Sequence, residues 1–134
     1  MSAGVFLVLV CSLFSLFTAQ LLACAPEPID PNNQEVINAA TFAVNNYNEQ
    51  SKTDYEYKLV KVVSATNQIV AGIIYSITTE IGNTDCKKGT TSDVQFCNVI
   101  KDSQLAETLY CSFRVLVVPW EHVETVQSSY CEPH

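Results

Sequence analysis

The chain has 134 residues, of which 48% are hydrophobic, and 14 acidic against 7 basic side chains give it a formal net charge of −7. An acidic domain repels phosphate, so the charge argues against nucleic-acid binding, and the chain lacks a polybasic patch that would hold it on anionic lipid. The length suits one ordinary domain, without internal repeats or low-complexity tracts.

An apolar stretch opens the chain, and the first charged side chain is Glu27. Membrane anchors and secretory signal peptides both begin this way. A spanning helix needs about 20 apolar residues, whereas this stretch is shorter and is interrupted by small and polar residues. We therefore interpret residues 1–23 as a signal peptide, although its first residues lack Lys and Arg. Cleavage falls within 19–25, with Ala23 favoured, and residues 24–134 form one secreted, extracellular domain.

Secretion implies an oxidising compartment, so four cysteines in the second half of the chain predict two disulfides. They are Cys86, Cys97, Cys111 and Cys131. Three pairings are open, and pairing of nearest neighbours would close two short loops. Cys24 lies at the cleavage point, where we expect it to be trimmed or exposed. The only histidines are His122 and His134 and no C-x-x-C pair occurs, so no metal site is predicted.

The predicted elements begin after an extended, exposed tail, residues 24–33, which holds three prolines. A helix is expected over 31–49, with Asp30 as N-cap and Pro31 at the first helical position. Apolar residues recur at helical spacing on its inner face, and its outer face carries Asn38, Asn45, Asn48 and Glu49.

The apolar period then changes to two, which is typical of strands. Strand patterns cover 55–59, 69–81, 111–117 and 123–130, and the stretch 82–104 is polar and irregular. A helix followed by antiparallel strands predicts an α+β fold, with one helix lying on a single sheet.

Two short segments between these strands attract attention, namely Gln68–Gly72 and Val118–Trp120. The first could be an ordinary strand with a glycine kink, and the second a turn whose indole packs on the core. However, both fall at hairpin turns, and alternate turns of a meander emerge at the same end of a sheet.

Taken in order, these motifs make the chain resemble the secreted (type 2) cystatins. The matching features are the apolar leader, Phe42–Asn48 at the helix end, Gln68-Ile69-Val70-Ala71-Gly72, the four cysteines, and Val118-Pro119-Trp120. The resemblance implies a five-stranded antiparallel sheet wrapped around one long N-terminal helix, which suggests that two strands are merged in the stretch 55–81. It also implies the disulfides Cys86–Cys97 and Cys111–Cys131.

The function implied by the resemblance is reversible, tight and competitive inhibition of papain-like (C1, cathepsin-type) cysteine proteases. A wedge of tail and two hairpins would enter the protease cleft, with no catalytic residue, cofactor or metal of its own. The expected contact residues are Glu27, Pro28, Gln68, Ile69, Val70, Ala71, Gly72, Pro119 and Trp120.

The sequence departs from the family pattern at two positions. Glu27 occupies the place of a tail glycine, which should weaken the contribution of the tail to binding. Lys52 stands where legumain-inhibiting members carry an Asn, so no legumain inhibition is expected. We expect a monomer, for which exchange of the helix and first strand across the Gln68–Gly72 turn is a route to a dimer.

Two other functions compete with inhibition. The altered tail would suit a secreted, non-inhibitory binding or host-defence protein that keeps the cystatin fold. An enzyme would need a nucleophile with a base in hydrogen-bond reach, but Cys24 lies in the tail and His134 ends the chain. The sequence therefore predicts a protein that is not an enzyme.

Overall fold

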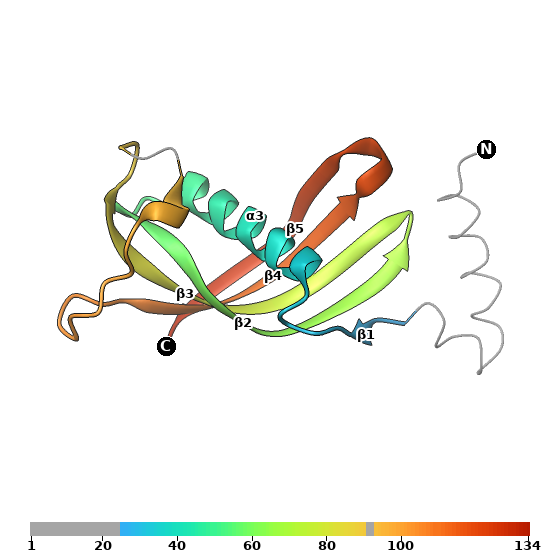
Figure 1. The fold of residues 1–134 in the computed structure, drawn as a ribbon, viewed down its shortest axis with the longest axis horizontal. Helices are drawn as coiled ribbons and strands as arrows, with labels where there is room; N and C mark the ends of the chain where they lie inside the picture. The colour runs from blue at the N-terminus through green and yellow to red at the C-terminus, as the bar shows by residue number, and fades with distance from the viewer. Residues whose placement is uncertain (1–24, 91–92) are drawn as a thin grey trace.

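The structure, a computed structural model, describes residues 25–90 and 93–134. The expected signal peptide and Cys24 lie outside the described residues. A five-stranded antiparallel sheet, in the order β1-β2-β3-β4-β5, curves around a single long helix (Figure 1). The strands are β1 (Glu27–Pro28), β2 (Tyr55–Val70), β3 (Gly72–Lys87), β4 (Thr108–Val118) and β5 (Val123–Pro133), and the helices are α3 (Gln34–Gln50) and the 3-10 turns η2 (Val94–Phe96) and η3 (Pro119–Glu121).

The sheet confirms five strands, but their assignment differs from the expected one. The stretch 55–81 holds β2 and part of β3, which pair from Tyr55↔Lys87 to Val70↔Gly72. The apolar run that begins at Ile69 therefore crosses a hairpin turn. The fifth strand comes from the tail, where Glu27 pairs with Asn67 and Pro28 with Thr66. A two-residue strand that itself contains a proline has no period to detect, which is why the sequence pattern missed it.

Helix α3 begins later than expected. Its N-cap is Asn33, whose side chain accepts a 2.9 Å hydrogen bond from the backbone N–H of Glu35. Asp30 instead closes a turn ahead of the helix, since its carboxylate accepts from Asn32 N–H and its carbonyl from Asn33 N–H, both at 2.9 Å. Pro31 lies inside this turn and not at the first helical position.

The helix packs on the sheet through small side chains, which allow the two to approach closely. Its buried apolar residues are Val36, Ala39, Ala40, Ala43 and Val44, and the sheet meets them with larger ones, including Tyr57, Tyr75, Ile77, Ile81, Phe113 and Val115. This alternation of small and large side chains fills a single core. No helix among the described residues is both long and apolar enough to span a membrane.

One polar side chain inside this core corrects the sequence analysis. Asn48, which was expected on the outer face of the helix, is 5% exposed. Its amide donates to the backbone carbonyl of Tyr57 and accepts from the Tyr57 N–H, each at 2.8 Å. The Asn48 side chain thus supplies the two hydrogen bonds that a neighbouring strand would otherwise make to Tyr57. It links the start of β2 to the end of α3.

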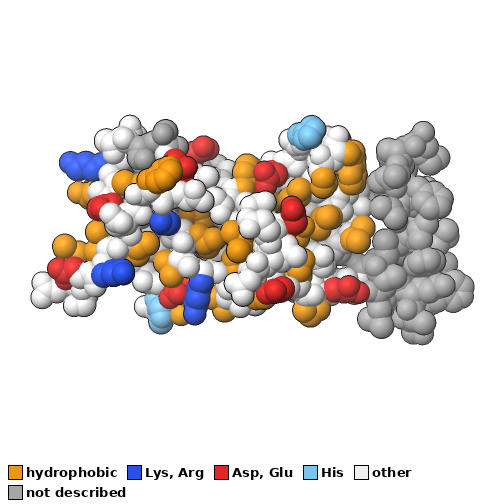
Figure 2. Space-filling view, in the orientation of Figure 1, with side chains coloured by type: hydrophobic (Ala, Val, Ile, Leu, Met, Phe, Trp, Pro, Cys, Tyr) orange, Lys and Arg blue, Asp and Glu red, His pale blue; other side chains and the backbone are white. Residues whose placement is uncertain are grey.

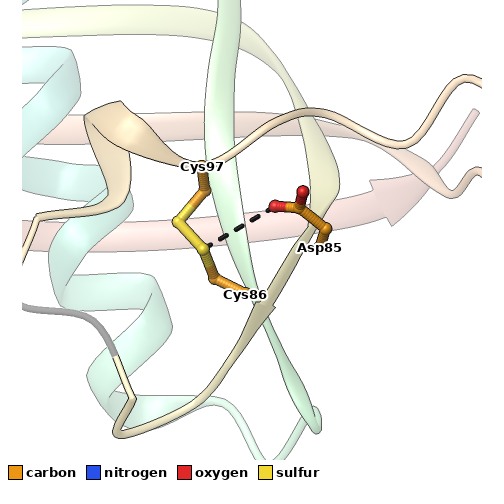
Figure 3. A group of neighbouring side chains, drawn as sticks. All are labelled: Asp85, Cys86 and Cys97. Atoms are coloured by element: carbon orange, nitrogen blue, oxygen red, sulfur yellow. Dashed lines mark hydrogen bonds between the residues drawn. A yellow bond between two sulfur atoms is a disulfide. The ribbon is translucent and has the colours of Figure 1, made fainter.

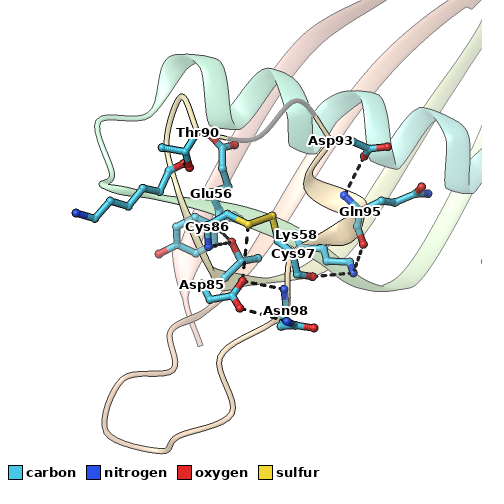
Figure 4. The surroundings of a disulfide bond; sticks show 12 residues. Glu56, Lys58, Asp85, Cys86, Thr90, Asp93, Gln95, Cys97 and Asn98 are labelled. Atoms are coloured by element: carbon cyan, nitrogen blue, oxygen red, sulfur yellow. Dashed lines mark hydrogen bonds between the residues drawn. A yellow bond between two sulfur atoms is a disulfide. The ribbon is translucent and has the colours of Figure 1, made fainter.

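Both disulfides form the expected pairs. Cys111 and Cys131 stand opposite each other on β4 and β5, with their Cα atoms 4.1 Å apart. Cys86 at the end of β3 is joined to Cys97, which follows η2 (Figure 4). Lys58 supports this second disulfide, because its ammonium donates to the carbonyls of Gln95 and Cys97.

Asp85 lies beside the Cys86–Cys97 disulfide (Figure 3). Its carboxylate is 3.7 Å from the Cys86 sulfur, a contact that is not a hydrogen bond because a disulfide sulfur carries no hydrogen. The backbone and side-chain N–H groups of Asn98 both donate to Asp85, and these bonds lower the pKa of the carboxyl. Because Cys86 and Cys97 form a disulfide, neither sulfur is a thiolate that could bind a metal ion, and only the Asp85 carboxylate remains as a ligand. We therefore assign these three residues a structural role.

Candidate functional site

The hairpin that joins β2 to β3 turns through a single residue, Ala71, between the paired Val70 and Gly72. Gly72 has φ +132°, a conformation that other residues rarely adopt. A Cβ there would lie 2.8 Å from the backbone oxygen of Val117 on β4. Glycine is therefore required twice, for the turn and for the close approach that sets this hairpin against the end of β4.

The hairpin that joins β4 to β5 turns through η3. Pro119 starts the turn, and His122 ends it in the left-handed conformation, φ 54° and ψ 39°, with its N–H donating to the Pro119 carbonyl at 3.2 Å. Trp120 lies within the turn and is 58% exposed. The indole is thus exposed to solvent. The alternative that it packs on the core, which a Pro-Trp turn also allows, is wrong for this hairpin.

Strand β1 brings the tail to the same end. It runs antiparallel to β2, and the Ile29 N–H donates to the Ala65 carbonyl at 3.1 Å. Because Glu27 pairs with Asn67, the residues ahead of Glu27 continue toward Gln68 and the hairpin turn. Figure 1 shows the three segments at one end of the molecule, beyond the N-terminal end of α3.

The expected contact residues differ in exposure. Glu27, Pro28, Ala71 and Pro119 are exposed, Gln68 and Val70 are half-buried, and Gly72 is buried. Ile69 is 51% exposed and lies two residues from the exposed Ala71, so the hairpin presents apolar side chains to solvent. Hydrophobic side chains are visible at this end in Figure 2, as they are elsewhere on the face drawn. We name the exposed end formed by 27–28, 68–72 and 119–120 the tip.

A cavity that the sequence pattern did not reveal lies beside the tip. It has a volume of about 280 Å³, between the first turns of α3 and the β4–β5 hairpin, and its lining includes Glu35, Asn38, Pro119, His122 and Glu124. Burial, and to a smaller extent the charge of Glu35, raises the pKa of the Tyr75 hydroxyl. Long-range contacts between helix and hairpin carry no local sequence signal.

A second cavity, of about 430 Å³, lies at the opposite end and is lined by polar residues that include Asn45, Asn48, Glu49 and Lys88. Near it, Lys88 donates to the carbonyl and hydroxyl of Ser51 and so fixes the loop that carries the exposed Lys52.

The described residues assemble no catalytic group. Their cysteines are all in disulfides. His134 stacks on Tyr110 with 4.4 Å between ring centroids, on the strand end opposite the tip, whereas His122 lies in the tip hairpin. The arrangement can present a surface to a partner, but it pairs no nucleophile with a base.

A helix lying across one antiparallel sheet, with a tail and two hairpins meeting at one end, defines a cystatin-like protein. A family model for the cystatin domain matches residues 24–120. Cystatin-2 of Crotalus adamanteus is 38% identical over 105 residues, 78% of this chain and 76% of that protein. Cystatin of Gallus gallus is 35% identical over 108 residues, 81% and 77% of the two chains.

Among solved structures, dimeric human cystatin F matches with a TM-score of 0.79 and 32% identity, over 82% of this chain and 87% of that chain. The chain therefore belongs to the cystatin family, and its features are those of a type 2 member. Membership supports a general role as a cysteine protease inhibitor, in keeping with a protein that is not an enzyme.

Proposed function

We propose that this protein is a secreted, reversible and competitive inhibitor of papain-like cysteine proteases, and that the tip is the part that enters the protease cleft. The observation that carries the proposal is the close approach of Gly72 to Val117, which sets the two exposed hairpins that carry Ile69 and Trp120 side by side. A cleft that binds extended peptides offers a complementary groove.

The chemistry of the tip suits occupation of a cleft without reaction. Ile69 and Ala71 supply apolar area that excludes water, and the tight turn presents backbone groups between them. Trp120 is a large, rigid side chain of the kind that dominates interface energies, and Pro119 restricts the turn that carries it. Because the turns are held by the sheet, little conformational freedom is lost on binding.

The tail makes a smaller contribution in this proposal. The pairing of Glu27 and Pro28 with β2 fixes the direction of the tail, but a charged residue between prolines replaces the glycine of the family pattern. The tail therefore adapts less well to a narrow cleft. A second departure from the family pattern concerns legumain. The loop after α3 carries the exposed Lys52 in place of the Asn found in legumain-inhibiting members, and we propose that legumain is not inhibited.

The test is an inhibition assay of the disulfide-bonded domain, residues 24–134, against papain and a panel of lysosomal cysteine proteases. We expect tight competitive inhibition, and a loss of about 100-fold or more in affinity when Val70→Ala and Trp120→Ala are combined. Phe96→Ala is the matched control, because Phe96 is a more exposed aromatic residue, 83%, on η2 near the other end.

A folded protein that inhibits no member of the panel would overturn the proposal. The non-inhibitory binding protein would then be the better description, and Glu27 is the feature that favours it.

A further inference from the structure

The acidic and basic side chains of this protein are distributed unevenly along the sheet. Four carboxylates lie on or beside the tip: Glu27 on β1, Glu35 in the first turn of α3, Glu121 in η3 and Glu124 near the start of β5. Glu35 and Glu124 line the same cavity as Pro119 and His122. We name these four side chains the acidic rim.

Within the described residues, Lys and Arg side chains are absent from this end, where His122 is the one imidazole. Arg114 pairs with Ser128, four residues before the end of β4, which corresponds to about 13 Å along the strand. Lys61 pairs with Glu80, nine residues before the end of β2. The other five lysines lie still farther away, at positions 52, 58, 87, 88 and 101. On the face drawn in Figure 2, Lys and Arg side chains lie only in the half away from the tip.

The formal charges therefore divide into −4 at the rim and −3, from ten acidic and seven basic side chains, over the rest of the chain. Residues 1–24 and 91–92 add no charged side chain to either part. Most of the net charge is concentrated around the small surface on which the exposed apolar residues Ile69 and Trp120 lie. An apolar centre with a polar border is the usual anatomy of a protein interface, and here the polar border is acidic.

We propose that the acidic rim selects, among the proteases of the proposed function, those whose cleft is bordered by Lys and Arg side chains. The rim attracts such a protease over distances longer than the contact itself and turns the tip toward the cleft during the encounter. A protease with an acidic border is repelled by the same charges. This inference rests on the proposed function, because it concerns the partner of the same tip.

Charges at the edge of an interface act mainly on the rate of association and its salt dependence, whereas the apolar centre controls dissociation. The Debye length, over which charges attract each other in solution, falls from about 30 Å at 0.01 M salt to about 8 Å at 0.15 M. Attraction by the rim should therefore weaken as the salt concentration rises. The rim thus predicts a kinetic signature that apolar contacts do not share.

The experiment measures association and dissociation rate constants by stopped-flow for two papain-like proteases, one with a basic and one with an acidic cleft border, at 0.01 and 0.15 M salt. For the basic protease we expect association to slow about 10-fold at the higher salt. For the protease with the acidic cleft border, association should become faster at the higher salt concentration, because repulsion is screened. The double variant Glu121→Gln/Glu124→Gln should associate several-fold more slowly with the basic protease at low salt, with its dissociation rate unchanged.

The control is Glu49→Gln/Asp54→Asn, which changes the net charge equally but lies at the end of α3 and in the following loop, away from the tip. It should leave most of the salt dependence intact. The inference would be overturned if both proteases bound with association rate constants that changed neither with salt nor in the rim variant. The proposed function would still stand in that case. Binding of neither protease by the folded domain would overturn both.

Discussion

Gly72 and Gly89 both have positive φ angles, +132° and +81°, but their surroundings differ. A Cβ on Gly72 would meet the Val117 oxygen at 2.8 Å, whereas a Cβ on Gly89 would meet nothing within 4 Å. The first glycine is needed for contact between two hairpins, and the second only for the conformation of a loop.

We predict that Gly72→Ala costs about 2–4 kcal/mol in the free energy of unfolding and weakens protease inhibition, because strain and a backbone clash act together. Gly89→Ala should cost about 1 kcal/mol, from strain alone, and leave inhibition unchanged. Urea unfolding and inhibition assays on both variants make the comparison. Equal losses would show that contact with Val117 is unimportant.

Asp85 makes stability depend on pH in a defined direction. Hydrogen bonds from Asn98 hold the pKa of Asp85 below its ordinary 3.8. The unfolded chain lacks these bonds, so the contribution of the carboxylate to stability is present above about pH 4 and is lost as pH falls through the folded-state pKa.

Asp85→Asn should therefore be less stable than the parent at pH 7, and the difference should close near pH 2. Urea unfolding at both values tests this, with Asp102→Asn as a control for a second exposed aspartate that accepts backbone hydrogen bonds. A difference that stays constant with pH would mean that the charge of Asp85 is not what Asn98 stabilises.

At the scale of elements, Asn48 joins the end of α3 to the start of β2 through two hydrogen bonds to Tyr57. We predict that Asn48→Ala costs about 3 kcal/mol, because it leaves a buried N–H and a buried carbonyl of the same residue unpaired. Asn45→Ala is the matched control, since Asn45 is exposed on the same helix and lines the same cavity. It should change stability by less than about 0.5 kcal/mol.

Thermal or urea unfolding of the two variants measures the difference. A small loss for Asn48→Ala would indicate that water from the neighbouring cavity replaces the amide.

The elements also show how far the sequence could be interpreted. Alternation of apolar and polar residues located the main strands, and helical spacing located α3, because both patterns are local. The N-cap could not be chosen between Asp30 and Asn33, since both are good caps and only the turn geometry distinguishes them. Asn48 was misplaced because its partner, Tyr57, belongs to another element.

Motif and order predicted the two hairpins of the tip, and both turns lie where expected, whereas their contact with a protease stays a prediction. The pairing of β1 with β2, the approach of Gly72 to Val117 and the cavity beside His122 depend on contacts between distant segments. The acidic rim was likewise hidden, because its four members are separated in the chain by as many as 97 residues.

At the scale of the whole molecule, the turn at Ala71 links two strands of 16 residues each. Short turns of this kind favour exchange of an element between copies, because opening the turn relieves its constraint. Exchange of α3 and β2 would give a dimer that keeps the native contacts but straightens the turn.

We predict that dilution from mid-transition denaturant yields such a dimer, with native circular dichroism but without protease inhibition, because the tip is lost. Size-exclusion chromatography with light scattering, followed by inhibition assays of each peak, tests this. A dimer that inhibits as well as the monomer would indicate assembly elsewhere, for example along the outer edge of β5.

Under the proposed function, folding and recognition depend on largely separate residues of this molecule. Ile69, Ala71 and Trp120 lie outside the buried core cluster, and the frame behind them is held by α3, the sheet and two disulfides. These three side chains can therefore be changed without loss of the contacts that stabilise the fold. Libraries randomised at these three positions, with Gly72 kept, should remain folded at nearly the parental frequency and yield binders for unrelated grooved targets, so this small domain is a natural starting point for display-based engineering.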